Sequence, residues 1–276
     1  MIQDRRLPRA IRTTVLVVLT LIFIFPVLWT LASAIKPTDI LFARPPQFLF
    51  DPIDDHFRSA LSGDSGVVSG LLHSVVVSGG STLLVVLIGT PAAYALSRLQ
   101  PRGRDDMMLF VLASRMAPPV ALIIPFFLVY KELELLETQI GLIVAYLTFN
   151  LSFYVWVLAI FIKEIPADLE AGGHADGYGR WHVFTRVILP LMRPSIIATA
   201  ILVFIFAWNE FAYALILGGR GAETLPVVIS RYITPSGVEF GELAAIGAIA
   251  LAPICVIVFV LHKHIIRGLS MGAVKG

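Results

Sequence analysis

The chain has 276 residues, of which 57% are hydrophobic and 14% are charged, and its formal net charge is +2. Because soluble domains carry about 25% charged residues, this composition argues against a soluble enzyme. The sequence holds no long run of lysine and arginine of the kind that binds nucleic acid. The apolar residues instead gather in stretches of about 20, the length that crosses a bilayer as a helix. We therefore expect an all-α integral membrane protein surrounded by lipid.

Six apolar stretches are predicted to span the membrane, at about residues 13–33, 71–96, 107–129, 139–162, 195–217 and 243–262. The first follows a basic segment and ends near Ala32-Ser33-Ala34, so it resembles a signal peptide. Its apolar part is longer than the roughly 7–15 residues of a signal peptide, which favours an uncleaved helix. Residues 36–70 are too polar to lie in lipid. We treat residues 1–276 as one transmembrane domain.

The distribution of positive charge between the loops predicts the orientation of the chain. With the N-terminus in the cytoplasm, the inner segments carry 14 of the 21 lysine and arginine residues, and the outer segments carry six. Cytoplasmic loops are enriched in these residues, so both termini are predicted to be cytoplasmic. Arg115 is the one remaining residue of these 21, and it lies inside a predicted span. It precedes Pro118-Pro119 inside the third span, which indicates a broken helix, either at a gate or at a simple kink.

The segment between the fourth and fifth spans, residues 164–194, is far longer than the 2–8 residues usual between bundle helices. Pro166 suits the first turn of a helix, and Asp168 and Glu170 would lie favourably at its positive end. Asp176-Gly177 is a stop signal. Beyond it, apolar residues recur on one helix face, at Trp181, Phe184, Ile188 and Leu191. A short helix, a turn and a re-entering helix are therefore predicted, and such a protruding helix suits docking into a groove on a partner.

This segment resembles the cytoplasmic EAA loop of permeases in ATP-binding-cassette importers. The matching residues are Asp168, Leu169, Glu170, Asp176, Gly177, Phe184, Leu189, Pro190, Leu191 and Pro194. Further similar segments are Pro26–Trp29 with Lys36-Pro37, Pro118-Pro119 with Pro125, Trp208–Phe211, Thr224–Pro226 and Arg267–Gly276. Together they cover nearly the whole chain and resemble carbohydrate permeases of the maltose-transporter MalG type.

One departure from the family pattern lies inside the loop. Aligned on Asp176-Gly177, the Glu-Ala-Ala of the family falls on Ala171-Gly172-Gly173. Each glycine costs about 0.8–1.0 kcal/mol relative to alanine in a helix, so a weaker docking helix is expected. Glu170 is a candidate to replace the missing acid, although it lies about 100° around the helix from position 171. Changing residues 171–173 to Glu-Ala-Ala is predicted to keep or raise transport.

The resemblance implies a type I importer permease with six transmembrane helices and a cytoplasmic coupling helix, in a bacterial or archaeal plasma membrane. It implies a second permease subunit, two ATP-binding cassette ATPase subunits and an extracytoplasmic sugar-binding protein as partners. ATP and Mg are then expected in the ATPase, and this chain has no GxxxxGK[ST] loop of its own. The expected cargo is a di- or oligosaccharide such as trehalose or maltose. Leu189-Pro190-Leu191 is interpreted either as a stiff joint or as a plain helix boundary.

Polar and aromatic residues inside the predicted spans are candidates for the translocation pathway, namely Asn150, Trp156, Trp208, Asn209, Glu210 and Tyr213. A carboxylate in a span is expected to face a cavity or a helix contact rather than lipid. Contact with sugar and hydrogen bonding between helices both remain open for these residues. An alternative function is a self-contained secondary transporter or channel that uses Glu210 as an ion or proton site. An intramembrane enzyme would need a clustered catalytic set, and none is apparent.

Overall fold

The computed structural model of the protein describes residues 9–99, 101–116, 118–234 and 237–271. The chain is nearly all helical, as the composition predicts, and it forms two compact units. The first unit contains the described residues up to Val67 together with Ile229–Ala252. The second contains Val68–Val228 together with the described residues from Pro253 onwards.

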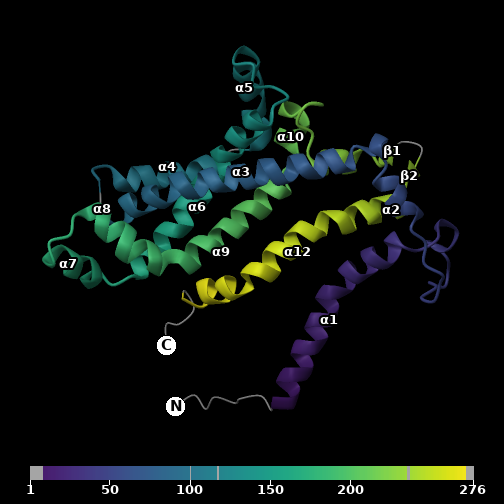
Figure 1. Ribbon diagram of the computed structural model, residues 1–276, viewed down its shortest axis with the longest axis horizontal. Coiled ribbons are helices and arrows are strands. Elements are labelled where there is room, and N and C mark those ends of the chain that lie inside the picture. Colours follow the sequence, from purple (N-terminus) through teal and green to yellow (C-terminus); the bar gives the residue numbers. More distant parts are fainter. Residues whose placement is uncertain (1–8, 100, 117, 235–236, 272–276) are drawn as a thin grey trace. The chain divides into compact units, whose positions relative to one another are not determined.

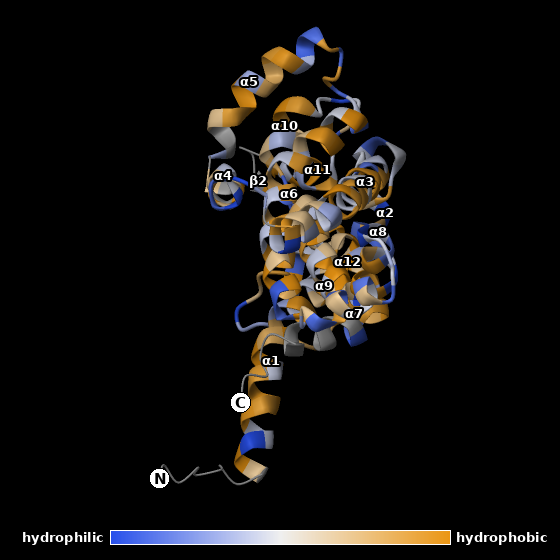
Figure 2. Cartoon of the chain, turned by 90° about the vertical axis from the view of Figure 1, so that its left-hand side faces the viewer, coloured by the Kyte–Doolittle hydropathy of each residue, from blue (hydrophilic) through white to orange (hydrophobic). Residues whose placement is uncertain are grey.

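The first unit is built on two apolar helices joined to a short polar region. Its elements are α1 (Arg9–Ala34), α2 (Asp55–Ala60), β1 (Ile233–Thr234), β2 (Gly237–Val238) and the first part of α12 (Phe240–Met271). The two strands pair antiparallel, with Ile233 opposite Val238. Helix α1 is apolar on all sides, as its predominantly orange colour shows in Figure 2. Phe23 within it is 77% exposed, which suits a helix whose surroundings are lipid.

The polar region after α1 folds around a buried lysine. The Lys36 ammonium lies over the rings of Trp29 and Phe50, 5.3 and 5.1 Å from their centroids. It also donates a hydrogen bond of 2.8 Å to the backbone oxygen of Gln47. His56 contacts the Lys36 carbonyl oxygen through Nε2 at 3.0 Å. Through these contacts, the residues that were predicted to be too polar for lipid form an ordered structure at the end of α1.

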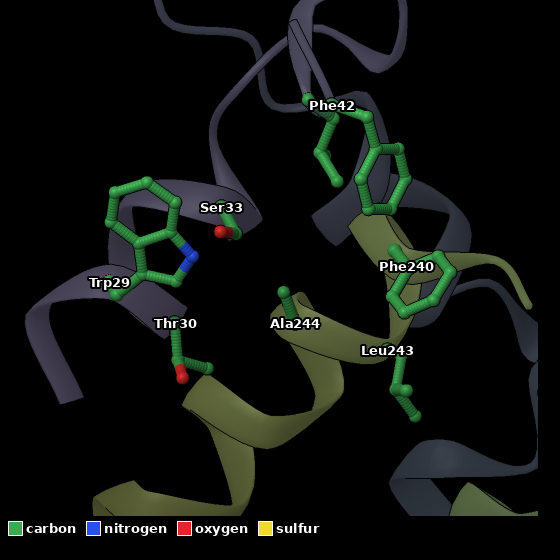
Figure 3. Close-up of a pocket in the computed structure, with 8 residues that line it drawn as sticks. Trp29, Thr30, Ser33, Phe42, Phe240, Leu243 and Ala244 are labelled. Atoms are coloured by element: carbon green, nitrogen blue, oxygen red, sulfur yellow. The ribbon is translucent and has the colours of Figure 1, made fainter. Parts of the chain in front are cut away.

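A cavity of about 470 Å³ opens beside this region, within the same unit. It is lined by Trp29, Thr30, Ser33, Leu41, Phe42, Phe240, Leu243 and Ala244. The rings of Trp29 and Phe240 lie on opposite sides of it (Figure 3). Phe42 and Phe240 meet edge to face, with their ring centroids 4.8 Å apart. The cavity wall is therefore aromatic and mostly apolar.

The second unit is a helical bundle with α6 at its centre (Figure 1). Its elements are α3 (Val67–Tyr94) followed by a π turn (Ala95–Leu99), α4 (Arg104–Met116), α5 (Pro119–Glu132), α6 (Gln139–Glu164), α7 (Asp168–Ala175), α8 (Arg180–Val183) followed by a π turn (Phe184–Ile188), α9 (Leu189–Trp208), α10 (Ala212–Leu217) and α11 (Leu225–Ser230). Helices α4 and α9 both pack against α6. Helices α7 and α8 lie at one end of this unit, and α5 and α10 lie at the other (Figure 1).

Small residues let α3 approach α6 closely. A Cβ atom on Gly89 would lie 2.6 Å from the ring of Tyr154, and one on Gly80 would lie 2.8 Å from Ile143. Thr90 and Tyr154 are joined by a hydrogen bond of 2.8 Å between their hydroxyls. Glycine at helix contacts and hydroxyl hydrogen bonds between helices are typical of membrane proteins, in which lipid removes the hydrophobic drive for helices to associate.

Among the described residues, five helices are long and apolar enough to cross a membrane. They are Ala10–Ala34, Val67–Leu99, Gln139–Glu164, Arg180–Trp208 and Phe240–Lys263, and they overlap the first, second, fourth, fifth and sixth predicted spans. The fifth was predicted as 195–217, but its helix ends at Trp208, and the rest of the predicted span forms a break and the separate helix α10. The third predicted span, 107–129, is instead the pair α4 and α5. The break falls beside Pro118-Pro119, because proline has no amide hydrogen and disfavours helical geometry in the residue before it. Pro119 then starts α5, which is the position in a helix that proline suits best.

Candidate functional site

The loop between α6 and α9 contains the short helix that the sequence predicts. Helix α7 begins at Asp168, with Asp168 and Glu170 in its first turn. It ends in a glycine motif, because Gly177 adopts φ +85° in the left-handed region. The amide of Gly177 bonds to the carbonyl of His174 at 3.0 Å, and the amide of Tyr178 bonds to that of Gly173 at 3.1 Å. This pair of bonds is the Schellman arrangement, so the predicted stop signal at Asp176-Gly177 is confirmed.

The two glycines of α7 have different surroundings. A Cβ atom on Gly172 would meet nothing within 4 Å, whereas one on Gly173 would lie 2.9 Å from a methyl group of Val183. Val183 is fully buried, so Gly173 is the point where α7 packs against α8. The expected benefit of alanine therefore holds only at Gly172. At Gly173 the expected gain in helix propensity is opposed, since alanine there would push on a buried and conformationally stiff side chain. The effect of the triple change on transport stays a prediction.

Glu170 points into the protein. Arg98 Nε lies 2.7 Å from Glu170 Oε1, and the two side chains are only 16% and 13% exposed. Tyr94 donates a hydrogen bond of 3.0 Å to Glu170 Oε2. The carboxylate is thus engaged with Arg98 and Tyr94 within the chain, which argues against Glu170 as a replacement for the acid missing at Ala171. Arg98 and Tyr94 were not predicted to be partners of Glu170. Their four-residue spacing was the one available signal, because side chains at this spacing lie on the same face of a helix.

The loop carries exposed apolar and aromatic side chains on α7, on the turn that follows and on α8. Leu169 and Tyr178 are 44% and 49% exposed, and no residue of α7 is buried. Trp181 is 71% exposed, and it also lines an apolar cavity with Pro91 of α3 and Leu189 of α9. We call Leu169, Tyr178 and Trp181 the loop surface. The rings of Tyr178 and His182 stack with their centroids 4.4 Å apart. Large exposed apolar side chains on a protruding helical hairpin mark an interaction site, so the loop surface is suited to dock on another protein.

Other residues of the predicted loop signature are exposed or lead into the membrane helix. Asp168, Ala171 and Asp176 are exposed, whereas Phe184 is 5% exposed. Phe184 packs between Tyr94 and Trp181, with ring centroids 4.7 and 5.4 Å away.

Leu189 and Pro190 begin α9 without breaking the helical run. Residues Arg180–Trp208 form one continuous helical stretch that contains the π turn Phe184–Ile188. The Leu189 amide bonds to the Phe184 carbonyl, five residues back, which is the wider spacing of a π turn. Pro190 offers no amide hydrogen of its own. The plain-boundary interpretation of this segment is therefore not supported, because the helix passes through it from the loop into the membrane.

The candidate pathway residues do not share one environment. Tyr213 and Trp208 are 2% and 4% exposed and pack against other aromatic rings. Trp156 is 38% exposed. Asn209 is exposed and donates to the Ile205 carbonyl at 2.7 Å. Asn150 is fully buried, and neither end of its amide has a hydrogen-bond partner within the described part of the chain.

Glu210 lies in the break between α9 and α10, where it caps a helix. Its carboxylate accepts hydrogen bonds from the amides of Ala212, Tyr213 and Ala214 at 3.1, 3.0 and 3.2 Å. These amides are the first of α10 and have no partner within the helix. A negative charge there is also favoured by the helix dipole. Of the two interpretations left open for Glu210, structural hydrogen bonding therefore gains direct support.

Comparison with known proteins agrees with this arrangement. Residues 85–271 match the protein family described as the binding-protein-dependent transport system inner membrane component. The trehalose transport system permease protein SugB of Mycobacterium tuberculosis is 35% identical over 257 residues, which cover 92% of this chain and 93% of that protein. The trehalose/maltose transport system permease protein MalG of Thermococcus litoralis is 31% identical over 270 residues, 94% of each chain.

The fold is also similar to that of solved structures. A chain in the crystal structure of a bacterial ABC transporter involved in the import of the acidic polysaccharide alginate matches with a TM-score of 0.73. The match has 18% sequence identity and covers 94% of this chain and 99% of that chain. At this identity the likeness speaks for the fold, which is that of a type I importer permease.

Proposed function

Because this chain belongs to the family of binding-protein-dependent transport system inner membrane components, we propose that it is the permease subunit of an ATP-driven carbohydrate importer. The single observation that carries this proposal is the exposed loop surface, whose Trp181 lies on the helical stretch Arg180–Trp208 that continues without interruption into the membrane. A self-contained carrier has no use for such a helix, whereas a subunit driven by a separate ATPase requires one.

The loop surface is proposed to dock on an ATP-binding cassette subunit. Leu169, Tyr178 and Trp181 would enter a groove on that subunit, as an amphipathic helix does in other helix-in-groove complexes. Trp181 is the natural anchor, because large aromatic residues dominate the binding energy at protein interfaces. ATP and Mg would be bound by the ATPase, and hydrolysis would take place there. Closure of two ATPase subunits would then move α7 and, through it, the membrane helices.

The proposed assembly contains a second permease subunit, two ATPase subunits and an extracytoplasmic sugar-binding protein. This chain would supply half of the translocation pathway. Both of its termini are proposed to lie in the cytoplasm of a bacterium or archaeon, on the same side as α7. The positive charge of the inner segments supports this orientation. The chain is therefore a transport subunit and not itself the ATPase.

A di- or oligosaccharide is the proposed cargo. The support is that two relatives above 30% identity are a trehalose permease and a trehalose/maltose permease. The alternative of a secondary carrier depends on Glu210 as a free ion or proton site. Both oxygens of that carboxylate already accept backbone hydrogen bonds at the start of α10, so it has little capacity left for an ion.

The proposal is tested by ATP hydrolysis in the complete complex. The chain is assembled with its candidate ATPase, second permease and binding protein, and hydrolysis is measured with each of several sugars. Hydrolysis that rises only when one sugar and the binding protein are both present supports the proposal and names the cargo. If the complex forms and no sugar alters hydrolysis, a carbohydrate importer is the wrong assignment. The Trp181→Ala complex is the control for docking, because it should lose the bound ATPase.

A further inference from the structure

Three side chains join the loop to the end of α3 inside the second unit. Arg98 Nε lies 2.7 Å from one oxygen of Glu170, and Tyr94 donates to the other oxygen at 3.0 Å. We call Tyr94, Arg98 and Glu170 the loop clamp. Helix α7 has no buried residue of its own, and its close packing contact is the one between Gly173 and Val183. The clamp is therefore the main polar attachment of α7 to the membrane helices.

The same arginine also reaches α6. Its Nη2 donates to the carbonyl oxygen of Ile162 at 2.9 Å and to that of Ile165. These carbonyls lie at the C-terminal end of α6, where a positive charge is favoured by the helix dipole. The Ile162 oxygen also accepts a hydrogen bond of 3.2 Å from the Ile165 amide. Arginine can serve a carboxylate and two carbonyls together because its planar group carries five donors. A lysine could not hold all these partners in one geometry.

Tyr94 extends the cluster to a fourth element. Its ring packs against Phe184 with the centroids 4.7 Å apart, and Phe184 belongs to the π turn that leads into α9. Arg98 itself lies in the π turn Ala95–Leu99 that closes α3. The clamp thus connects α7 with the ends of three membrane helices, α3, α6 and α9, through side chains that water reaches poorly.

We propose that the loop clamp is the joint that passes a displacement of α7 to α3, α6 and α9. Arg98 and Tyr94 are then positioning residues that couple ATP hydrolysis to transport, without touching ATP or sugar. This inference rests on the proposed function, since coupling exists only if an ATPase acts on α7. If the loop clamp only stabilised the fold, its removal would have a different effect on the two activities. Its loss would lower hydrolysis and transport together, because fewer intact complexes would form.

The test compares sugar transported with ATP hydrolysed in the complete complex in proteoliposomes. Glu170→Gln removes the charge but keeps the size of the side chain, and Tyr94→Phe removes one hydroxyl. The amount of sugar moved per ATP is expected to fall at least about fivefold in Glu170→Gln, the lower end of the coupling between linked sites. Tyr94→Phe is expected to lower it less, while hydrolysis continues in both variants.

Two matched variants serve as controls. Tyr154→Phe removes the hydroxyl that bonds Thr90, so it breaks a contact between α3 and α6 without touching α7. Glu132→Gln neutralises an exposed acid at the end of α5. Both should keep the wild-type ratio. An unchanged ratio in both Glu170→Gln and Tyr94→Phe would overturn the inference, as would a parallel loss of hydrolysis and transport. A wild-type complex without sugar-dependent hydrolysis would instead refute the proposed function, and the inference with it.

Discussion

Gly172 and Gly173 give a matched pair of substitutions with opposite expected effects on α7. Replacing Gly172 by alanine adds a methyl group in open space, so the change should stabilise the helix by about 0.8–1.0 kcal/mol. The same replacement at Gly173 gains as much in helix propensity but sets its Cβ 2.9 Å from a Val183 methyl group. Overpacking of this kind costs about 1–3 kcal/mol, so the net effect runs from near zero to a loss of about 2 kcal/mol.

Hydrogen–deuterium exchange of the peptide that covers α7 measures this difference in the full-length chain. Local opening of a short surface helix governs its exchange, so the stabilisation at Gly172 should slow exchange about four- to fivefold. Gly173→Ala should exchange as fast as the wild type or faster. In a Val183→Ala background the Gly173 change should become less harmful, because the obstructing methyl group is gone. Equal protection by the two alanine substitutions would refute the packing argument.

Three further perturbations follow from contacts in the two units. Glu210→Ala removes the cap of α10 and should lower the stability by about 0.5–2 kcal/mol in a thermal unfolding assay. Glu210→Gln should lose less stability because one acceptor oxygen remains, and equal losses in the two variants would argue against capping. Trp181→Ala should abolish co-purification of the ATPase without lowering the melting temperature of the chain, since this side chain is 71% exposed; retained binding would place the docking site elsewhere. Gly241→Ala should destabilise the first unit, because its Cβ would lie 2.2 Å from the buried His56 ring, and combination with His56→Ala should restore part of the loss if this contact is the cause.

The membrane helices were predictable because composition alone decides which segments can lie in lipid. Apolar length placed the first, second, fourth and sixth spans as single helices, whereas the fifth, predicted as 195–217, is interrupted after Trp208. The third came out as two helices, and its prolines had already indicated a broken helix there. The side chain of Arg115 lies outside the described residues, so its role as part of a gate stays a prediction. The cytoplasmic position of the termini and the single-domain organisation also stay predictions.

The loop was predictable in outline but not in its contacts. Local signals at Pro166, Asp168 and Gly177 predicted a short helix with a defined start and stop, because caps and turns depend on neighbouring residues. Pro166 was expected in the first helical turn but precedes α7, which begins at Asp168. The partners of Glu170 come from the end of α3, about 70 residues earlier, and no local pattern joins them. For the same reason Gly173 was interpreted as a defect in the helix, whereas the structure shows it in contact with Val183.

Glu210 was correctly singled out in the sequence, but its role as a helix cap was not predicted. Its presence in an apolar stretch flagged it at once, since a carboxylate in a span is costly unless it has partners. The break between α9 and α10 was not foreseen, and that break creates the amides which the carboxylate binds. A helix interruption without proline or glycine leaves little trace in the sequence. Asn209-Glu210 could have been interpreted as a cap of a second helix, because asparagine and acids are frequent at helix starts.

The most direct test of the central claim is sugar uptake by the complete complex in proteoliposomes, with the binding protein on one side and ATP enclosed on the other. The account predicts accumulation of sugar that requires ATP and the binding protein, and that disappears when the bound ATPase is lost in Trp181→Ala. Uptake driven by an ion gradient without ATP would contradict it, and would return Glu210 to consideration as an ion site.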